Sequence, residues 1–216
     1  MSEFRFPAWT DRARPLAAAL LALVPCYALG MLYYGGSPQT IAVGYQPVQP
    51  IPYSHALHAG ELRIDCRYCH TPGETAGHMG MPSTAVCMNC HATIAVDSEK
   101  LLPLKESAVT GRPIRWVRVH DLPDYVYFDH SAHVFRGVGC VSCHGRVDTM
   151  ERVYQAEKLS MGWCLECHRN PERHLRPQQF VTDMTWTPNE DQVVQGKRLA
   201  EQNNIKPSTD CSTCHR

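Results

Sequence analysis

Hydrophobic residues gather in one uninterrupted run near the start of the chain. Residues 16–36 read LAAALLALVPCYALGMLYYGG and contain no charged side chain. A helix needs about 20 consecutive apolar residues to cross the hydrocarbon core of a bilayer. The run therefore predicts one transmembrane helix over residues 16–36, which anchors the chain in membrane lipid.

Basic residues lie on only one side of this run. Arg5, Arg12 and Arg14 precede it, and the next Lys or Arg is Arg63. Because segments rich in Lys and Arg stay in the cytoplasm, residues 1–15 are predicted to be cytoplasmic and the rest periplasmic, in a bacterial inner membrane. A cleaved signal peptide is the alternative, with a candidate cleavage site at residues 28–30, but the run is long for a signal core.

Polar and apolar residues are more evenly mixed after residue 36. Residues 37–52 are rich in proline and predict an extended linker. Residues 189–202 read NEDQVVQGKRLAEQ and predict a short helix with a polar face. The candidate chemistry lies in the remaining segment, residues 53–216, which is predicted to form one periplasmic domain.

Five copies of the pattern Cys-x-x-Cys-His occur in this domain. They comprise Cys66, Cys69 and His70; Cys87, Cys90 and His91; Cys140, Cys143 and His144; Cys164, Cys167 and His168; and Cys211, Cys214 and His215. In the c-type haem attachment motif, both cysteines form thioethers to the porphyrin and the histidine binds the iron. Zinc sites and disulfides also use paired cysteines, but neither needs a histidine after every second cysteine. The sequence therefore predicts five c-type haems.

The spacing of the motifs restricts the fold. They fall between Cys66 and His215, so roughly thirty residues are available per haem. This is too little polypeptide to enclose each haem in a conventional core, and apolar burial is expected mostly against porphyrin faces. We expect a mostly irregular and helical fold with little or no sheet, in which stacked haems form the core.

Charge adds little to this picture. The 21 basic and 21 acidic residues balance, which gives no indication of a nucleic-acid partner. Arginines near the motifs either neutralise haem propionates or are ordinary solvated residues. These are Arg67, Arg169, Arg173, Arg176 and Arg216.

Two segments of the domain resemble each other. Residues 53–58 (YSHALH) precede the motif at Cys66, and residues 128–133 (FDHSAH) precede the motif at Cys140. In both, an aromatic residue is followed by a His-x-x-His pair, and a second motif follows the first. We interpret them as two dihaem modules, at about 53–100 and 120–175, joined by a connector over 92–119, with the fifth haem at 211–215.

The histidines outside the motifs are candidates for the second axial position of each iron. In the His-x-x-His pairs, His55 is expected to serve the haem at Cys66 and His130 the haem at Cys140. His58 and His133 would then reach neighbouring haems. The fifth distal ligand stays open among His120, His174 and a methionine, above all Met161. Met81 and Met150 also lie near motifs, although packing is the commoner role of methionine, and His78 is expected at the surface.

On these residues the chain resembles the class III multihaem cytochromes c. More closely, the segments IPYSHALHAGELRIDCRYCHT, HDLPDYVYFDHSAHVFRGVGCVSCHG and MGWCLECHRNPE are similar to the pentahaem subunit of alternative complex III. The resemblance implies a subunit of a membrane quinol oxidoreductase. Its partners would be an iron–sulfur subunit, multi-span quinol-binding subunits and a monohaem cytochrome c. It would pass electrons to a periplasmic carrier or a terminal oxidase.

Haems with two protein ligands have no open iron position, which predicts electron transfer and no catalytic residues on this chain. One alternative is a stand-alone, membrane-anchored multihaem quinol dehydrogenase that feeds a periplasmic reductase. Another is an enzyme such as a multihaem nitrite reductase. That class often has Lys in place of one motif histidine, and no such variant motif occurs here.

Overall fold

The computed structural model describes residues 5–35, 42–71 and 75–215. The chain divides into two compact units, Met1–Ala42 and Val43–Arg216. The first unit contains a single helix, and the second contains all five Cys-x-x-Cys-His motifs. Arg216, one of the arginines considered above, lies outside the described residues.

Helix α1 (Trp9–Gly35) of the first unit matches the hydrophobic run. It begins seven residues before Leu16 and is long and apolar enough to cross a membrane, with a mean hydropathy of 2.0. None of its side chains is buried by other parts of the protein. Pro15 and Pro25 lie within it, as helices in a lipid environment tolerate. The prediction of one N-terminal apolar helix is confirmed.

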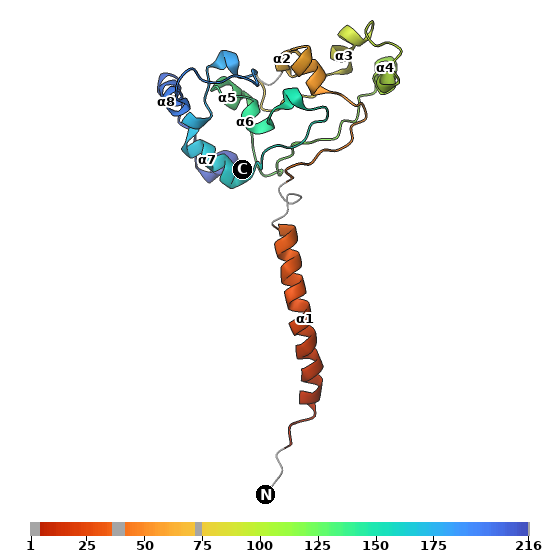
Figure 1. Ribbon diagram of the computed structural model, residues 1–216, viewed down its shortest axis with the longest axis vertical. Helices are drawn as coiled ribbons and strands as arrows, with labels where there is room; N and C mark the ends of the chain where they lie inside the picture. The colour runs from red at the N-terminus through yellow and green to blue at the C-terminus, as the bar shows by residue number, and fades with distance from the viewer. Residues whose placement is uncertain (1–4, 36–41, 72–74, 216) are drawn as a thin grey trace. The chain divides into compact units, whose positions relative to one another are not determined.

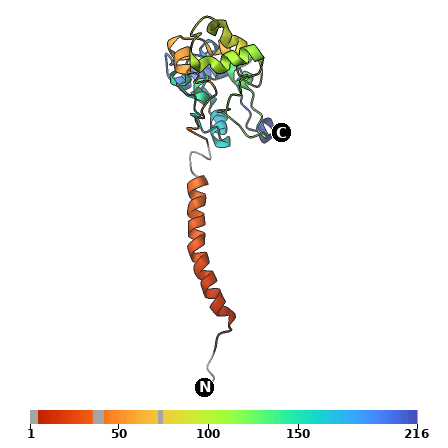
Figure 2. The same ribbon diagram turned by 90° about the vertical axis from the view of Figure 1, so that its right-hand side faces the viewer.

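The second unit consists of short helices joined by irregular segments (Figures 1 and 2). Its α-helices are α2 (Cys66–Cys69), α3 (Thr84–His91), α4 (Leu102–Thr110), α5 (His130–Phe135), α6 (Val141–His144), α7 (Met161–Arg169), α8 (Gln192–Gln202) and α9 (Cys211–Cys214). A π-helix, η1 (Ala56–Glu61), and the 3₁₀ turns η3 (Glu99–Leu101), η4 (Val147–Thr149), η5 (Pro171–Arg173) and η6 (Gln178–Phe180) complete it. Over the described residues there is no sheet, only the isolated β-bridges Val126–His215 and Val138–Leu175.

Local sequence accounts for where several of these helices begin. The Asp65 carboxylate accepts a hydrogen bond from the Arg67 N–H at 2.8 Å and caps α2. Asp129 caps α5 in the same way, and Asp191 caps α8. The predicted helix over 189–202 is present as α8, and the predicted connector over 92–119 contains α4.

Few apolar side chains are buried in the second unit. Among the described residues the buried hydrophobic side chains are Ile51, Leu104, Val134, Met150, Leu175 and Val181. Unaided, so small a set would leave a domain of this length marginally stable. The sparse protein core agrees with the expected helical and irregular fold in which cofactors supply much of the buried surface.

Backbone segments approach closely at several glycines, two of which lie in helices. A Cβ on Gly60 of η1 would overlap the carbonyl oxygen of Asp148 in η4, and a Cβ on Gly196 of α8 would overlap the carbonyl oxygen of Glu172 in η5. Next to the first contact, the Ala56 N–H donates to the Met150 carbonyl at 3.0 Å. The helix of the first His-x-x-His pair therefore packs directly on the turn that follows the motif at Cys140.

Candidate functional site

Each motif occupies about one turn of helix. The histidine N–H donates to the carbonyl of the first motif cysteine in His70 (2.8 Å), His144 (3.0 Å) and His215 (2.9 Å). In α3 and α7 the motif forms the last turn of a longer helix. Both thiols and the imidazole of a motif are thereby held on a single helical turn, the arrangement that thioether attachment and iron ligation require.

Most of the motif thiols are partly withdrawn from water, whereas those of Cys90 and Cys211 are exposed. All eleven cysteines of the chain are free. Burial, with smaller contributions from the neighbouring Cys167 and Cys164 thiols, raises the pKa of Cys143 to about 12. Burial also raises the pKa of the Cys69, Cys87 and Cys164 thiols. The part of the chain described here holds no cluster of three or more side chains that could bind a metal ion by themselves.

Three motif histidines face a histidine from a His-x-x-His pair. The ring centroids are 6.1 Å apart for His58 and His91, 6.1 Å for His133 and His168, and 6.4 Å for His130 and His144. When two imidazoles bind one metal ion from opposite sides, each nitrogen lies about 2 Å from the metal, so the ring centres are roughly 6 Å apart. The donor set and spacing fit an iron porphyrin between each pair.

His55 is arranged less tightly. Burial lowers the pKa of His55 to about 4, with smaller contributions from His70 and His58. Within the described ranges, no acceptor lies in reach of its buried Nδ1. Among the described residues, the rings of His55 and His70 make no contact like those of the other three pairs, so the pairing of His55 with the haem at Cys66 stays a prediction.

The aromatic residue before each His-x-x-His pair packs against both histidines. The Tyr53 ring is 4.7 Å from His55, edge-on, and 4.4 Å from His58 with the rings 25° apart. Phe128 repeats this geometry, at 4.8 Å from His130, edge-on, and 4.4 Å from His133 at 30°. The sequence repeat thus has a three-dimensional counterpart, in which the aromatic ring fixes the directions of both imidazoles.

Backbone carbonyls orient most of these imidazoles. Nδ1 donates to a carbonyl oxygen in His58 (Ser54, 2.8 Å), His70 (Gly80, 3.1 Å), His91 (Ile94, 3.1 Å), His130 (Gly77, 3.1 Å), His133 (Asp129, 2.7 Å), His168 (Ser208, 2.6 Å) and His215 (Tyr125, 3.2 Å). A carbonyl can only accept, so Nδ1 carries the proton and Nε2 has a free lone pair. This is the tautomer that binds a metal through Nε2.

The candidates for the fifth distal ligand are scattered. The His120 ring lies edge-on to His144 at 4.4 Å, too close for a porphyrin between them, and its buried Nε2 has no partner among the described residues. Met161 is 67% exposed, and His174 makes no ring contact with a motif histidine in the described part of the chain. Met150 is buried in the core, Met81 is exposed, and His78 is exposed as expected.

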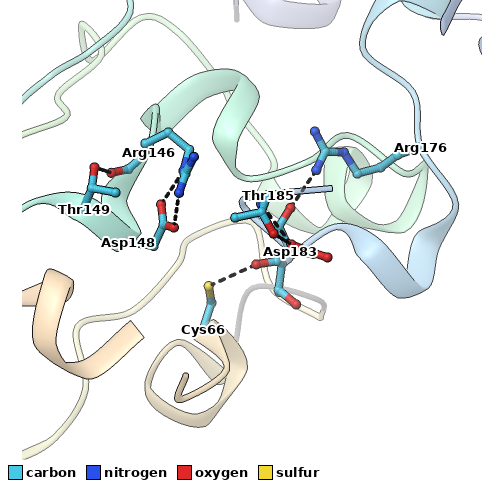
Figure 3. Close-up of polar contacts among 8 residues, drawn as sticks. Cys66, Arg146, Asp148, Thr149, Arg176, Asp183 and Thr185 are labelled. Atoms are coloured by element: carbon cyan, nitrogen blue, oxygen red, sulfur yellow. Dashed lines mark hydrogen bonds and ion pairs between the residues drawn. The ribbon is translucent and has the colours of Figure 1, made fainter. Parts of the chain in front are cut away.

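Arg176 is buried beside the motif at Cys140. Its Nη1 donates to the Asp183 carbonyl at 2.9 Å (Figure 3). Its guanidinium lies 5.0 Å from the centre of the Trp186 ring. A Cβ on Gly139 would overlap this guanidinium. Burial lowers the pKa of Arg176, while the nearby Cys140 thiol opposes the shift. Among the arginines considered from sequence, Arg176 therefore places a buried positive charge next to a haem-attachment motif.

Two functional features were not foreseen from the sequence. One is the packing of Tyr53 and Phe128 against the histidine pairs, for which the aromatic position in the repeat was a usable signal. The other is the loop at Gly77 and Gly80, whose carbonyls orient His130 and His70. Every residue has a backbone carbonyl, so the sequence could not indicate that those of Gly77 and Gly80 accept hydrogen bonds from these histidines.

Comparison with known proteins decides the family. Residues 126–216 match a family model described as cytochrome c7 and related cytochrome c. The chain is also 30% identical over 151 residues to a protein of Nitratidesulfovibrio vulgaris named menaquinone reductase, multiheme cytochrome c subunit; the match covers 60% of this chain and 71% of that relative.

The chain belongs to the multihaem cytochromes c. Its mostly helical and irregular fold without a sheet agrees with that family. Membership implies c-type haems at Cys-x-x-Cys-His motifs and a role in electron transfer. The N-terminal apolar helix and the relative's membership of a quinone reductase are consistent with a membrane-associated electron-transfer subunit.

Proposed function

We propose that this cytochrome is the pentahaem electron-transfer subunit of a membrane complex that oxidises quinol, of the alternative complex III type. It would relay electrons to a periplasmic carrier or a terminal oxidase. The haems, when bound, supply reversible one-electron oxidation and reduction. The protein's part is to hold them covalently, ligate both faces of each iron and exclude water.

The imidazole pairs about 6 Å apart are the observation that carries this proposal. In the proposed ligand set, each motif histidine binds one iron, and His55, His58, His130 and His133 supply four distal ligands. The fifth comes from His120, His174 or Met161. Two protein ligands leave an iron no position for substrate, which favours electron transfer over bond chemistry.

The partners follow from the resemblance and from the relative. The similar protein of Nitratidesulfovibrio vulgaris is named as a subunit of a menaquinone reductase, which supports an assembly that handles a quinone. We propose an iron–sulfur subunit, multi-span quinol-binding subunits and a monohaem cytochrome c as neighbours. Arginines occur before the apolar run at residues 16–36 and not directly after it, which favours a haem domain on the periplasmic side of a bacterial inner membrane.

A haem count and a set of ligand variants test the proposal. The pyridine haemochrome of the purified full chain should give five haems per polypeptide. His58→Ala and His133→Ala should each convert one haem from low-spin to high-spin and let it bind cyanide. His78→Ala is the matched control, since His78 is exposed, and should leave every haem low-spin. Fewer haems than motifs, or low-spin spectra in both ligand variants, would contradict the proposal.

A second candidate is a quinol dehydrogenase that needs no other subunit. A cavity of about 710 Å³ lies between α3 and α4 and is lined mostly by apolar and hydroxyl side chains, among them Met88, Ser107 and Trp116, together with Arg112. Its size suits a small aromatic molecule, and α3 carries the motif at Cys87. Quinol oxidation by the isolated chain, abolished by Trp116→Ala, would favour this candidate. No oxidation without the partner subunits is expected.

A further inference from the structure

We propose that the five motifs form a single row in space whose order differs from their order along the chain. The row runs from Cys87 to Cys66, then to Cys140, Cys164 and Cys211. The first two motifs are thus reversed, and the motif at Cys66 is the junction between the two modules. This inference rests on the proposed function only in assuming that each motif carries a haem.

The first cysteines of the two modules meet at one short segment. The Cys140 N–H donates to the Val181 carbonyl at 2.9 Å, and the Cys66 Sγ lies 3.9 Å from the next carbonyl, that of Thr182 (Figure 3). The edges of the two haem sites are therefore adjacent.

A loop of the first module orients histidines on both sides of the junction. The Gly77 carbonyl accepts hydrogen bonds from the His130 N–H at 3.0 Å and from its Nδ1 at 3.1 Å. Three residues later, the Gly80 carbonyl accepts from Nδ1 of His70 at 3.1 Å. The proximal histidine of one motif and the distal histidine proposed for the other are thus held by the same loop.

Helix packing supports the same junction. Gly60 of η1 lies against the Asp148 carbonyl of η4, and the Ala56 N–H donates to the Met150 carbonyl. Of the distal histidines proposed for the first module, His58 lies in η1 and His55 is its N-cap residue, and η4 follows shortly after the motif at Cys140. Two close backbone contacts leave this interface little freedom to shift.

Individual contacts indicate which of the remaining motifs are adjacent in the row. Asn89 of α3 donates to the Tyr68 hydroxyl of α2 at 3.1 Å, which places the Cys87 motif beside the Cys66 motif. Helix α5 presents His130 to His144 and, three residues on, His133 to His168. Nδ1 of His168 donates to the Ser208 carbonyl at 2.6 Å, just before the last motif.

Burial along the row supports this order. The cysteines of the three inner motifs are all half-buried. Cys90 and Cys211, in the outermost motifs, are exposed. The two ends are therefore the surfaces at which donor and acceptor proteins would meet the row, and its centre is shielded from both.

Iron positions test the order directly. Anomalous scattering from crystals of the haem-loaded full chain should place the iron bound by His70 nearer to that of His144 than the iron bound by His91 is. The reverse ranking would overturn the proposed order while leaving the proposed function intact. A preparation with haem missing from several motifs would instead contradict the proposed function, so the two failures are distinguishable.

Matched haem deletions give a second measurement on the same full chain. The double variant Cys66→Ser, Cys69→Ser should shift the reduction potential of the haem at Cys140, because it removes the adjacent redox centre. The control Cys87→Ser, Cys90→Ser removes an end of the row and should leave that potential unchanged. An equal or larger shift in the control would overturn the order.

Discussion

Arg176 allows a quantitative test of how this chain sets the reduction potential of a haem. Its side chain is buried, with the whole residue only 8% exposed, and its guanidinium lies against Gly139, next to the first cysteine of a motif. A fixed positive charge there disfavours the ferric state, which carries one more positive charge than the ferrous state. Replacing Arg176 with methionine keeps most of the side-chain length and removes the charge. We expect the haem at Cys140 to become harder to reduce.

The size of the effect follows from Coulomb's law. At an effective dielectric constant of about 20, a unit charge roughly 10 Å from the iron contributes about 1.7 kcal/mol, or about 70 mV for one electron. Arg176→Met should therefore lower one reduction potential by several tens of millivolts. The Asp183 carbonyl also loses its donor, which should cost about 1–3 kcal/mol of folding free energy.

An EPR-monitored redox titration of the purified chain can separate the individual low-spin haems. Arg118→Met is the matched control, because Arg118 makes an exposed ion pair with Asp121 and its side chain is 75% exposed. Solvent and salt screen such a charge, so the control should move no potential by more than about 10 mV. An unchanged or raised potential in Arg176→Met would refute the electrostatic argument.

Three other results are expected. Gly60→Ala should destabilise the chain by about 1–3 kcal/mol in thermal unfolding, because its Cβ would overlap the Asp148 carbonyl, whereas Gly162→Ala, with no protein atom within 4 Å, should be neutral or stabilising. The hydrogen bonds from Arg67 lower the pKa of Asp65 to about 2. Asp65→Asn should therefore lower the free energy of unfolding at pH 7, by less than about 1 kcal/mol because the site is exposed. This difference should disappear as the pH falls from about 4 to about 2, where the Asp65 carboxylate becomes protonated. Equal unfolding differences at pH 7 and pH 2 would argue against that role. A chain expressed without haem attachment should show no cooperative transition in near-ultraviolet circular dichroism, since its described apolar core is so small; a sharp transition would contradict a cofactor-based core.

Much of this cytochrome can be derived from residue order alone. A charge-free run of 21 residues predicts the apolar helix, and α1 contains nearly all of it. The Cys-x-x-Cys-His motif fits within one helical turn and depends only on local geometry. It therefore indicates a haem from sequence alone, as at Cys66, Cys69 and His70. The absence of a sheet also followed, because roughly thirty residues per motif leave no chain for one.

The pairing of the histidines could be predicted from the sequence only in part. The repeat of an aromatic residue and His-x-x-His singled out His58 and His133, and their rings face His91 and His168 at the spacing that a shared metal would need. The fifth distal position could not be derived. Its ligand depends on which loop returns to α9, and loops place their side chains through long-range contacts that local pattern does not encode.

Tertiary structure alone brings the motifs at Cys66 and Cys140 together, 74 residues apart in the chain. Their contact depends on the carbonyls of Gly77 and Gly80, on Gly60 against Asp148, and on the segment at Thr182. Carbonyl groups are common to every residue, so only the folded backbone determines which imidazole each one meets. Sequence thus determined which side chains carry the chemistry, and three-dimensional packing decided which of them are neighbours.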